Sequence, residues 1–451
     1  MSVEEKQETK DLTERKEEST KKTTSGGGSH RSHSHHRRRR RKSSFLNDVR
    51  HWFDKRFGRH SSLVMNLLAI FIALILVGGL TAVNLIAMAS KKPSGSDGTN
   101  SDANSQKPPS VQDEASLQLQ MPYFSEDVEL ASEAAVIYLS GNADANLVSI
   151  IERYQRGSRL DIGKPVVFEF ELLSAPAKLS NALVKLRISE NADFADAQEW
   201  TLEQGQKSLA VYNLKTATKY YYRICYGDSE QFVQGVFRTA DTRRFMNVAG
   251  AVNVRDIGGI KTTDGKTIRQ GLLYRGSELD GAVESKFLLQ YDGRNTMLNT
   301  MKIRFDMDLR VPSGVDALGN TVQHGNYDAP AYGGIFTEEG KAKIRAIFAD
   351  LADVNNYPIY MHCTYGMDRT GTVCYLLEAL LGASDEDLMK DYRLSAIYHG
   401  GTVTSVETIA PLINGLAMYE GTSTREKVEN YLLSAGVTAE EISNLREILL
   451  G

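Results

Sequence analysis

The chain has 451 residues, of which 41% are hydrophobic and 24% are charged, and it contains 37 Gly, 10 Pro and 3 Cys. This composition excludes collagen-like, fully disordered and disulfide-scaffold proteins. Residues 1–60 hold 17 Lys and Arg against 9 Asp and Glu, a net charge of +8, while the other 391 residues carry −12, which gives −4 overall. A basic N-terminal segment (the basic head, residues 1–60) and an acidic remainder (the body) indicate that the chain has distinct regions rather than one uniform domain.

The basic head is predicted to be a disordered tail followed by an interfacial helix. Residues 1–44 are rich in Lys, Glu, Ser, Thr and Gly without apolar periodicity, which is typical of disorder. The run His30–Lys42 admits nucleic-acid, metal and anionic-lipid binding, and we interpret it as a polybasic segment that faces membrane lipid, with no nucleic acid and no metal as partner. Residues 45–60 place apolar side chains at helical spacing among Arg and Lys, as in an amphipathic juxtamembrane helix.

One segment is predicted to span a membrane. Residues 61–90 contain no charged residue, and Leu63–Ala89 is apolar almost throughout. A transmembrane helix needs about 20 apolar residues to cross about 30 Å of hydrocarbon. The segment is too long and too far from the N-terminus for a removed signal peptide. Because most of the flanking basic residues lie before it, we expect a single-pass cell-membrane protein with a cytoplasmic N-terminus and an extracellular body.

The first part of the body has the pattern of short strands. Residues 91–120 are polar and rich in Ser, Gly, Asn and Pro, which predicts a flexible linker. Residues 121–240 are predicted to form an all-β sandwich, because alternating segments are separated by turn-forming residues. These segments are Pro165–Leu172, Leu183–Ile188, Ser208–Tyr212, Tyr220–Cys225 and Gln234–Thr239.

Part of this region resembles fibronectin type III domains. The stretch Leu214–Ile224 has the Leu and Tyr separated by a Thr-containing turn, and Gly235–Thr239 ends in Phe-Arg-Thr, as in the last strand of that family. The resemblance implies a spacer, or a module that binds a protein ligand.

The strongest chemical signal is a strand, a short loop and a helix around Cys363. Asn356–His362 has the pattern of a short buried strand, and Thr370–Leu381 that of an apolar helix. The five residues between Cys363 and Arg369 let the loop curl with its backbone N–H groups inward, next to the positive end of the helix. The positive electrostatic potential of the N–H groups and the helix end favours a thiolate at Cys363. The planar guanidinium of Arg369 can donate hydrogen bonds to two phosphoryl oxygens. This pattern predicts phosphate chemistry that uses no metal and no cofactor.

The other loop residues are predicted to bind the substrate. Gly366 permits a tight turn, and the hydroxyl of Thr370 can stabilise the sulfur as a leaving group. The predicted substrate-binding residues are Thr364, Tyr365, Gly366, Met367 and Thr370.

The loop resembles the Cys-x5-Arg signature of protein tyrosine phosphatases, and "HCTYGMDRTG" is similar to the bacterial tyrosine and lipid phosphatases whose loop reads His-Cys-x-x-Gly-Lys-Asp-Arg-Thr-Gly. Further segments are similar to motifs of that family and follow in the same order: Asn253–Gly259, Thr263–Leu279, Phe305–Arg310 and Asp385–Ser395. The resemblance covers about residues 241–451. It implies the α/β protein tyrosine phosphatase fold, with a mostly parallel central sheet flanked by helices.

The resemblance also implies roles for matching residues. Cys363 is the nucleophile that forms a phosphocysteine intermediate, Arg369 binds the phosphoryl group, and Asp368 is the general acid. Asp308 is the alternative acid. The expected supporting residues, which either shape the site or form buried ion pairs, are His362, Arg255, Asp256, Arg275 and Arg310.

One departure from the family's pattern concerns the substrate. Met367 stands where the family has Lys, and losing this cation weakens binding of polyanionic phosphoinositides more than of phosphotyrosine. We therefore expect a membrane-anchored, cysteine-dependent protein tyrosine phosphatase. The alternatives are a phosphoinositide, dual-specificity or broad phosphomonoester phosphatase of the same mechanism, and a surface binding module with vestigial catalysis.

Overall fold

The computed structural model describes residues 118–120, 124, 126–141, 147–154, 159–169, 171–174, 183–226, 232–311, 316–398 and 406–451. The predicted tail, juxtamembrane helix and transmembrane helix lie outside the described residues, as does the predicted linker up to residue 117. Within the described part of the chain, no helix is long and apolar enough to span a membrane. The described residues all belong to one compact unit, residues 110–451.

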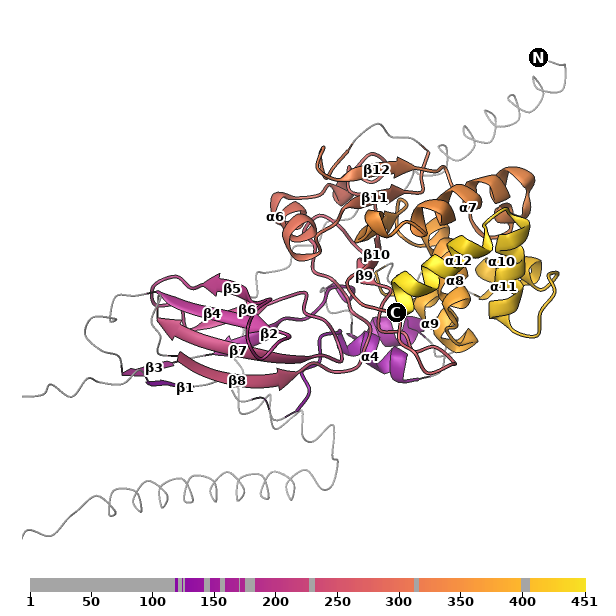
Figure 1. Ribbon diagram of the computed structural model, residues 1–451. Coiled ribbons are helices and arrows are strands. Elements are labelled where there is room, and N and C mark those ends of the chain that lie inside the picture. The colour runs from indigo at the N-terminus through magenta and orange to yellow at the C-terminus, as the bar shows by residue number, and fades with distance from the viewer. Residues whose placement is uncertain are drawn as a thin grey trace, which may run out of the picture. The chain divides into compact units, whose positions relative to one another are not determined.

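A five-stranded sheet with the order β12-β11-β13-β10-β9 forms the centre of the C-terminal region (Figure 1). Its strands are β9 (Arg255–Asp256), β10 (Leu273–Gly276), β11 (Phe305–Asp308), β12 (Gln323–Asn326) and β13 (Ile359–His362). All neighbours are parallel except β9 and β10. Every residue of β10, β11 and β13 is buried, as expected for parallel strands covered on both faces. The predicted mostly parallel sheet is confirmed.

Helical segments cover both faces of this sheet. On one face Leu273, Met307 and Met361 share a core with the larger helices. These are α7 (Glu338–Leu351), α8 (Asp368–Leu381), α9 (Asp385–Leu394), α10 (Val406–Leu416), α11 (Thr424–Ser434) and α12 (Ala439–Leu450). On the other face Tyr274 and Tyr360 pack with the segment that holds α6 (Tyr291–Asn295) and the helical turn Thr296–Thr300.

Side chains cap several of the larger helices, but not α8. The N-termini of α7, α9, α11 and α12 are capped by Thr337, Ser384, Ser423 and Thr438. The N-cap residue of α8, Met367, makes no side-chain capping bond, and neither does Gln290 before the short helix α6. The N–H groups of the first turn of α8 therefore lack the side-chain partner that these four helices have.

Strands dominate residues 159–240, as predicted. An antiparallel sheet has the order β5-β4-β7-β8, beside the antiparallel pairs β2-β6 and β1-β3 (Figure 1). The strands are β1 (Gln118–Gln120), β2 (Val166–Glu169), β3 (Glu171–Ser174), β4 (Val184–Ser189), β5 (Gln198–Thr201), β6 (Ser208–Val211), β7 (Lys219–Tyr226) and β8 (Phe232–Arg238). Phe168, Leu186 and Tyr222 join the β2-β6 pair and the four-stranded sheet in one core. The sequence pattern does not indicate β5, because its sequence Gln-Glu-Trp-Thr holds a single apolar residue, and it does not separate β3 from β2.

The prediction of an all-β region from residue 121 is wrong at its start. Helices α4 (Glu133–Ser140) and α5 (Leu147–Tyr154) precede the main strands, and β1 lies at the end of the segment predicted as linker. Ser132 caps α4, whose buried side chains form a core with Phe245 and Ile397 from the phosphatase-like region. Partners at least 91 positions away, Phe245 and Ile397, pack against these helices, so local strand patterns could not reveal them.

Candidate active site: the loop between β13 and α8

Cys363 follows directly on β13, and Asp368 is the first residue of α8. The predicted strand–loop–helix order is therefore confirmed, and the loop Cys363–Met367 connects the carboxyl end of a central strand to an uncapped helix N-terminus. Such a terminus is suited to bind an anion. Cys363 is only 4% exposed, whereas Arg369 in the first turn of α8 is half-buried.

The loop is held from outside through its carbonyl groups. The guanidinium of Arg275 donates to the Gly366 carbonyl at 2.8 Å, and the Asn253 amide donates to the carbonyls of Tyr365 and Gly366 at 3.1 and 3.2 Å. The Glu278 N–H donates to the Thr364 carbonyl at 3.1 Å. Because these bonds hold the loop through its carbonyl groups, the N–H groups of the loop stay available to bind an anion, as in an anion-binding nest.

Gly366 is required by this packing. Its φ is +67°, and a Cβ at this position would lie 2.3 Å from the Gly276 carbonyl oxygen. A side chain would therefore force the loop away from β10.

Behind the loop, two arginines share one carboxylate. Asp391 on α9 lies 2.8 Å from Arg255 Nε and 2.6 Å from Arg275 Nη1, and all three side chains are at most 2% exposed. Burial opposes ionisation of Asp391, but the two guanidinium groups hold its pKa well below the usual range. Ser395, on the turn after α9, accepts a hydrogen bond from Asn253 at 3.1 Å. The motif Asp385–Ser395 thus supports the loop from behind.

The predicted supporting residues differ in how close they lie to the loop. Arg275 donates to the Gly366 carbonyl of the loop, whereas Arg255 donates to Asp391 and Asn253, which support the loop. Asp256 pairs with Arg244 at 2.9 Å and accepts the N–H groups of Gly258 and Gly271, so it organises a turn away from the loop.

The alternative acid, Asp308, is fully engaged with a cation. Arg310 binds both oxygens of Asp308, with a shortest distance of 2.7 Å, and also pairs with Asp280 at 2.9 Å and with Glu278. Asp308 is completely buried. A carboxylate held in this way is poorly suited to give a proton to a leaving group.

His362 lies beneath the loop rather than at its mouth. Its Nε2 lies 3.1 Å from Asp306 Oδ1, and His324 lies 3.3 Å from the other oxygen of Asp306. Burial disfavours the imidazolium, but the charge of Asp306 outweighs this and raises the pKa of His362 to about 9. The residue before Cys363 therefore forms a buried ion pair with Asp306, which fixes the end of β13 beneath the loop.

Three of the loop's predicted residues have distinct surroundings. Arg369 has neither a hydrogen-bond nor a salt-bridge partner among the described residues. The Thr370 hydroxyl is buried and also lacks a partner there. The Tyr365 hydroxyl donates to Glu284, and its ring meets Phe287 edge-to-face at 5.6 Å. Arg369 and Thr370 are thus left available for an anion and for the sulfur.

Sequence reasoning missed several residues of this site. Asn253 and Asp391 lie in the family-like motifs Asn253–Gly259 and Asp385–Ser395. The motifs alone do not indicate which of their residues support the loop. Tyr332, whose hydroxyl donates to Asp368, lies in a segment that carried no signal at all. It belongs to the 3-10 turn Tyr332–Phe336, far from the loop in sequence.

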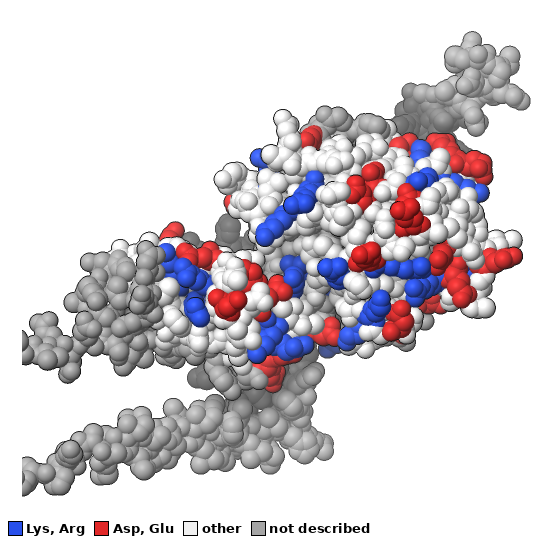
Figure 2. Space-filling model, in the orientation of Figure 1, with Lys and Arg blue, Asp and Glu red and all other residues white. Residues whose placement is uncertain are grey.

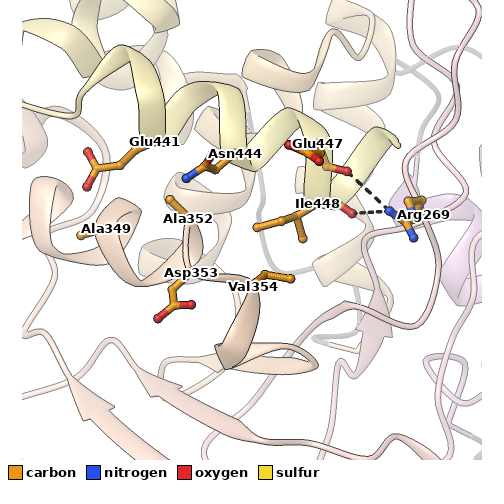
Figure 3. A pocket seen from close by; sticks show the side chains of 9 residues that line it. All are labelled: Arg269, Ala349, Ala352, Asp353, Val354, Glu441, Asn444, Glu447 and Ile448. Atoms are coloured by element: carbon orange, nitrogen blue, oxygen red, sulfur yellow. Dashed lines mark hydrogen bonds between the residues drawn. The ribbon is translucent and has the colours of Figure 1, made fainter.

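A separate cavity of about 630 Å³ lies between α7 and α12 (Figure 3). Its walls include Ala352, Val354 and Ile448, and Arg269 donates to the Ile448 carbonyl at 3.0 Å. None of its lining residues belongs to the loop or to the residues that hold it. On the face drawn in Figure 2, acidic and basic side chains of the described residues are interspersed, without a continuous basic area.

The comparisons with known proteins agree with the loop's chemistry. Residues 246–451 match the model of the tyrosine phosphatase family. The chain is a cysteine-based phosphatase, and hence a hydrolase. No curated protein matches it.

Among solved structures, the phosphatase is similar to the core catalytic domain of the PP-IP phosphatase SIW14 from S. cerevisiae, in complex with citrate. The identity is 13%, the TM-score is 0.23, and the match covers 36% of this chain and 84% of that chain. At this identity and TM-score, the likeness says nothing about the substrate of this phosphatase.

Proposed function

We propose that the chain is a protein tyrosine phosphatase that hydrolyses phosphotyrosine through a phosphocysteine intermediate. The observation that carries the proposal is the loop Cys363–Arg369. It joins a buried thiol, a helix N-terminus without a side-chain cap and a guanidinium that has no partner in the described part of the chain. These are the nucleophile and the anion site that transfer of a phosphoryl group needs.

The reaction proceeds in two steps. The Cys363 thiolate attacks phosphorus, the bond from phosphorus to the tyrosyl oxygen breaks, and the Asp368 carboxyl gives its proton to that oxygen. Water then attacks the phosphocysteine, the Asp368 carboxylate takes a proton from it, and the thiolate and inorganic phosphate are released. Arg369 and the N–H groups of the loop bind the phosphoryl oxygens in both steps, and the Thr370 hydroxyl stabilises the departing thiolate.

Asp368 is favoured over Asp308 as the acid by its surroundings. Asp368 is half-buried in the loop, next to Arg369, and its hydrogen bond comes from a neutral hydroxyl. Asp308 is buried and held by a guanidinium at both oxygens.

The charge balance around the loop supports phosphotyrosine over phosphoinositides. Arg255, Arg275 and Arg310 are buried and paired with carboxylates, which leaves them little attraction for further phosphates. Met367 adds no cation at the loop. The aromatic rings of Phe287, Tyr365 and Tyr398 lie in edge-to-face contact at 5.6 and 5.8 Å and offer an apolar rim for a tyrosine ring.

Two further parts of the proposal rest on sequence. The apolar segment Leu63–Ala89 and the basic residues before it support a single-pass membrane anchor with the phosphatase outside the cell. The sandwich is proposed as a fibronectin type III-like module for a protein ligand. The Lys215 N–H donates to the Tyr220 hydroxyl at 2.8 Å, which supports this assignment, because a tyrosine tied to the preceding corner recurs in such sandwiches.

The test uses the full-length chain in detergent, with reductant and a metal chelator. We expect hydrolysis of a phosphotyrosine peptide that Cys363→Ser abolishes. The Cys374→Ser variant is the matched control, because Cys374 is a fully buried thiol on α8 whose pKa burial raises to about 12. Activity that survives Cys363→Ser, or a folded wild-type protein without activity on any phosphomonoester, would contradict the proposal.

The substrate preference has its own test. In Met367→Lys, we expect the ratio of kcat/KM for a soluble phosphoinositide to that for the phosphotyrosine peptide to rise about tenfold, because one added cation contributes about 1–2 kcal/mol more to the polyanion. An unchanged ratio would show that Met367 does not set the preference.

A further inference from the structure

The Asp368 side chain is held by a pair of tyrosines. The Tyr332 hydroxyl donates to Asp368 Oδ1, and the Tyr392 hydroxyl lies 2.8 Å from the Tyr332 hydroxyl. The two rings meet edge-to-face at 6.2 Å. When Asp368 is ionised it has no proton to give, so the Tyr332 proton points to Asp368 and the Tyr392 proton points to Tyr332.

The backbone of Tyr332 is also tied to the first turn of α8. The Tyr332 N–H donates to the hydroxyl of Thr372 at 2.9 Å, and that hydroxyl donates to the Asp368 carbonyl at 2.8 Å. Tyr332 has φ +51°, a left-handed conformation that is costly for a side chain of this size. Two bonds to the same turn therefore hold a strained residue in one place relative to Asp368.

The second tyrosine connects this pair to the support of the loop. Tyr392 is 1% exposed and follows Asp391, the carboxylate that holds Arg255 and Arg275. Burial raises the pKa of Tyr392 to about 12, and burial together with the bond to Asp368 raises the pKa of Tyr332 further. Both hydroxyls therefore stay protonated over the whole range in which a phosphatase works.

We infer that Tyr332 is a positioning residue for the general acid. By occupying Oδ1 of Asp368, its hydroxyl leaves Oδ2 as the oxygen that carries the catalytic proton and directs it to the leaving group. Tyr392 fixes the rotation of the Tyr332 hydroxyl. This inference rests on the proposed role of Asp368.

The test compares two substrates that differ in their need for an acid, with the full-length protein. The leaving group of phenyl phosphate requires protonation much as tyrosine does, whereas that of p-nitrophenyl phosphate leaves readily as the anion. The two substrates are compared through kcat/KM, because this ratio reports the first step, in which the leaving group departs, and not the hydrolysis of the phosphocysteine that both substrates share. For Tyr332→Phe we expect kcat/KM to fall about tenfold with phenyl phosphate, as for a lost hydrogen bond to a charged group. With p-nitrophenyl phosphate we expect kcat/KM to change within about threefold.

A second variant keeps the test valid if Tyr332→Phe does not fold. In Tyr392→Phe the Tyr332 hydroxyl loses the neighbouring hydroxyl at 2.8 Å. We expect kcat/KM with phenyl phosphate to fall in the same direction as in Tyr332→Phe but by less, again with little change for p-nitrophenyl phosphate.

Tyr327→Phe is the matched control. Its hydroxyl donates to Asp350 at 2.6 Å, so it loses a Tyr–Asp hydrogen bond of the same kind without touching Asp368. We expect it to leave the ratio of the two substrates unchanged.

Three results would overturn the inference. An equal loss of kcat/KM on both substrates in Tyr332→Phe would indicate a structural role only. If Asp368→Asn itself loses kcat/KM equally on both, Asp368 is not the acid and the proposed mechanism fails with the inference. If the wild-type protein hydrolyses neither substrate, the proposed function itself is wrong.

Discussion

Replacing Asp391 by Asn removes the carboxylate that two buried guanidinium groups share. Arg255 and Arg275 lie 2.8 and 2.6 Å from its oxygens, and both arginines are fully buried. Breaking a buried ion pair from one side costs about 3–5 kcal/mol. In the compact unit of residues 110–451 each kcal/mol lowers Tm by about 1–2 °C, so we expect a loss of about 3–10 °C.

A neighbouring carboxyl modifies this value. Glu378 is 1% exposed, and burial together with the charge of Asp391 keeps its pKa well above the usual range. In Asp391→Asn the charge of Asp391 is absent, so Glu378 can ionise and partly replace it. The loss of Tm is then expected near the lower end of the range given above. The double variant Asp391→Asn, Glu378→Gln should then show the full loss.

The assay is calorimetric unfolding of the full-length protein, with hydrolysis of the phosphotyrosine peptide measured alongside. Asp387→Asn is the control on the same helix, since Asp387 is 34% exposed and pairs with Arg243 at 3.0 Å. Such a pair contributes about 1 kcal/mol or less. We also expect kcat to fall in Asp391→Asn, because Arg275 holds the Gly366 carbonyl. A Tm loss no larger than that of the control would refute the reasoning.

Two further predictions concern pH and the loop backbone. The pKa of His362, 6.5 when unperturbed, is raised by Asp306 to about 9 against the opposing effect of burial, so its stabilisation is complete below about pH 6.5 and is lost as the pH rises toward 9. Urea unfolding of the wild-type protein between these values should show the free energy of unfolding falling by about 2–3 kcal/mol, and an equally steep fall in Asp306→Asn would contradict this origin. For Gly366→Ala, with a Cβ placed 2.3 Å from the Gly276 carbonyl oxygen, we expect kcat to fall about 100-fold while circular dichroism shows the fold retained; near-normal kcat would disprove the close approach.

The loop around Cys363 could be predicted because its signals are local. A buried strand, five intervening residues and an apolar helix are read from consecutive residues, and the structure gives β13 and α8 at the expected positions. Most strands of the sandwich were predicted for the same reason, since alternation shows within each segment. The helices α4 and α5 were not, because their stability comes from contacts with Phe245 and Ile397 rather than from their own pattern.

The local sequence is enough to identify the residues that can do phosphate chemistry and the order in which they follow the strand. It also indicated the sheet, because runs of buried residues and turn signals depend only on near neighbours. Which charges are free to act depends on tertiary packing. Asp391, which lies 136 and 116 positions away in the sequence, neutralises Arg255 and Arg275, and Asp280 and Asp308, which lie 30 and 2 positions away, neutralise Arg310. Arg369 has no partner among the described residues. Burial and distance set these differences, and both arise from packing between segments that are remote in the chain.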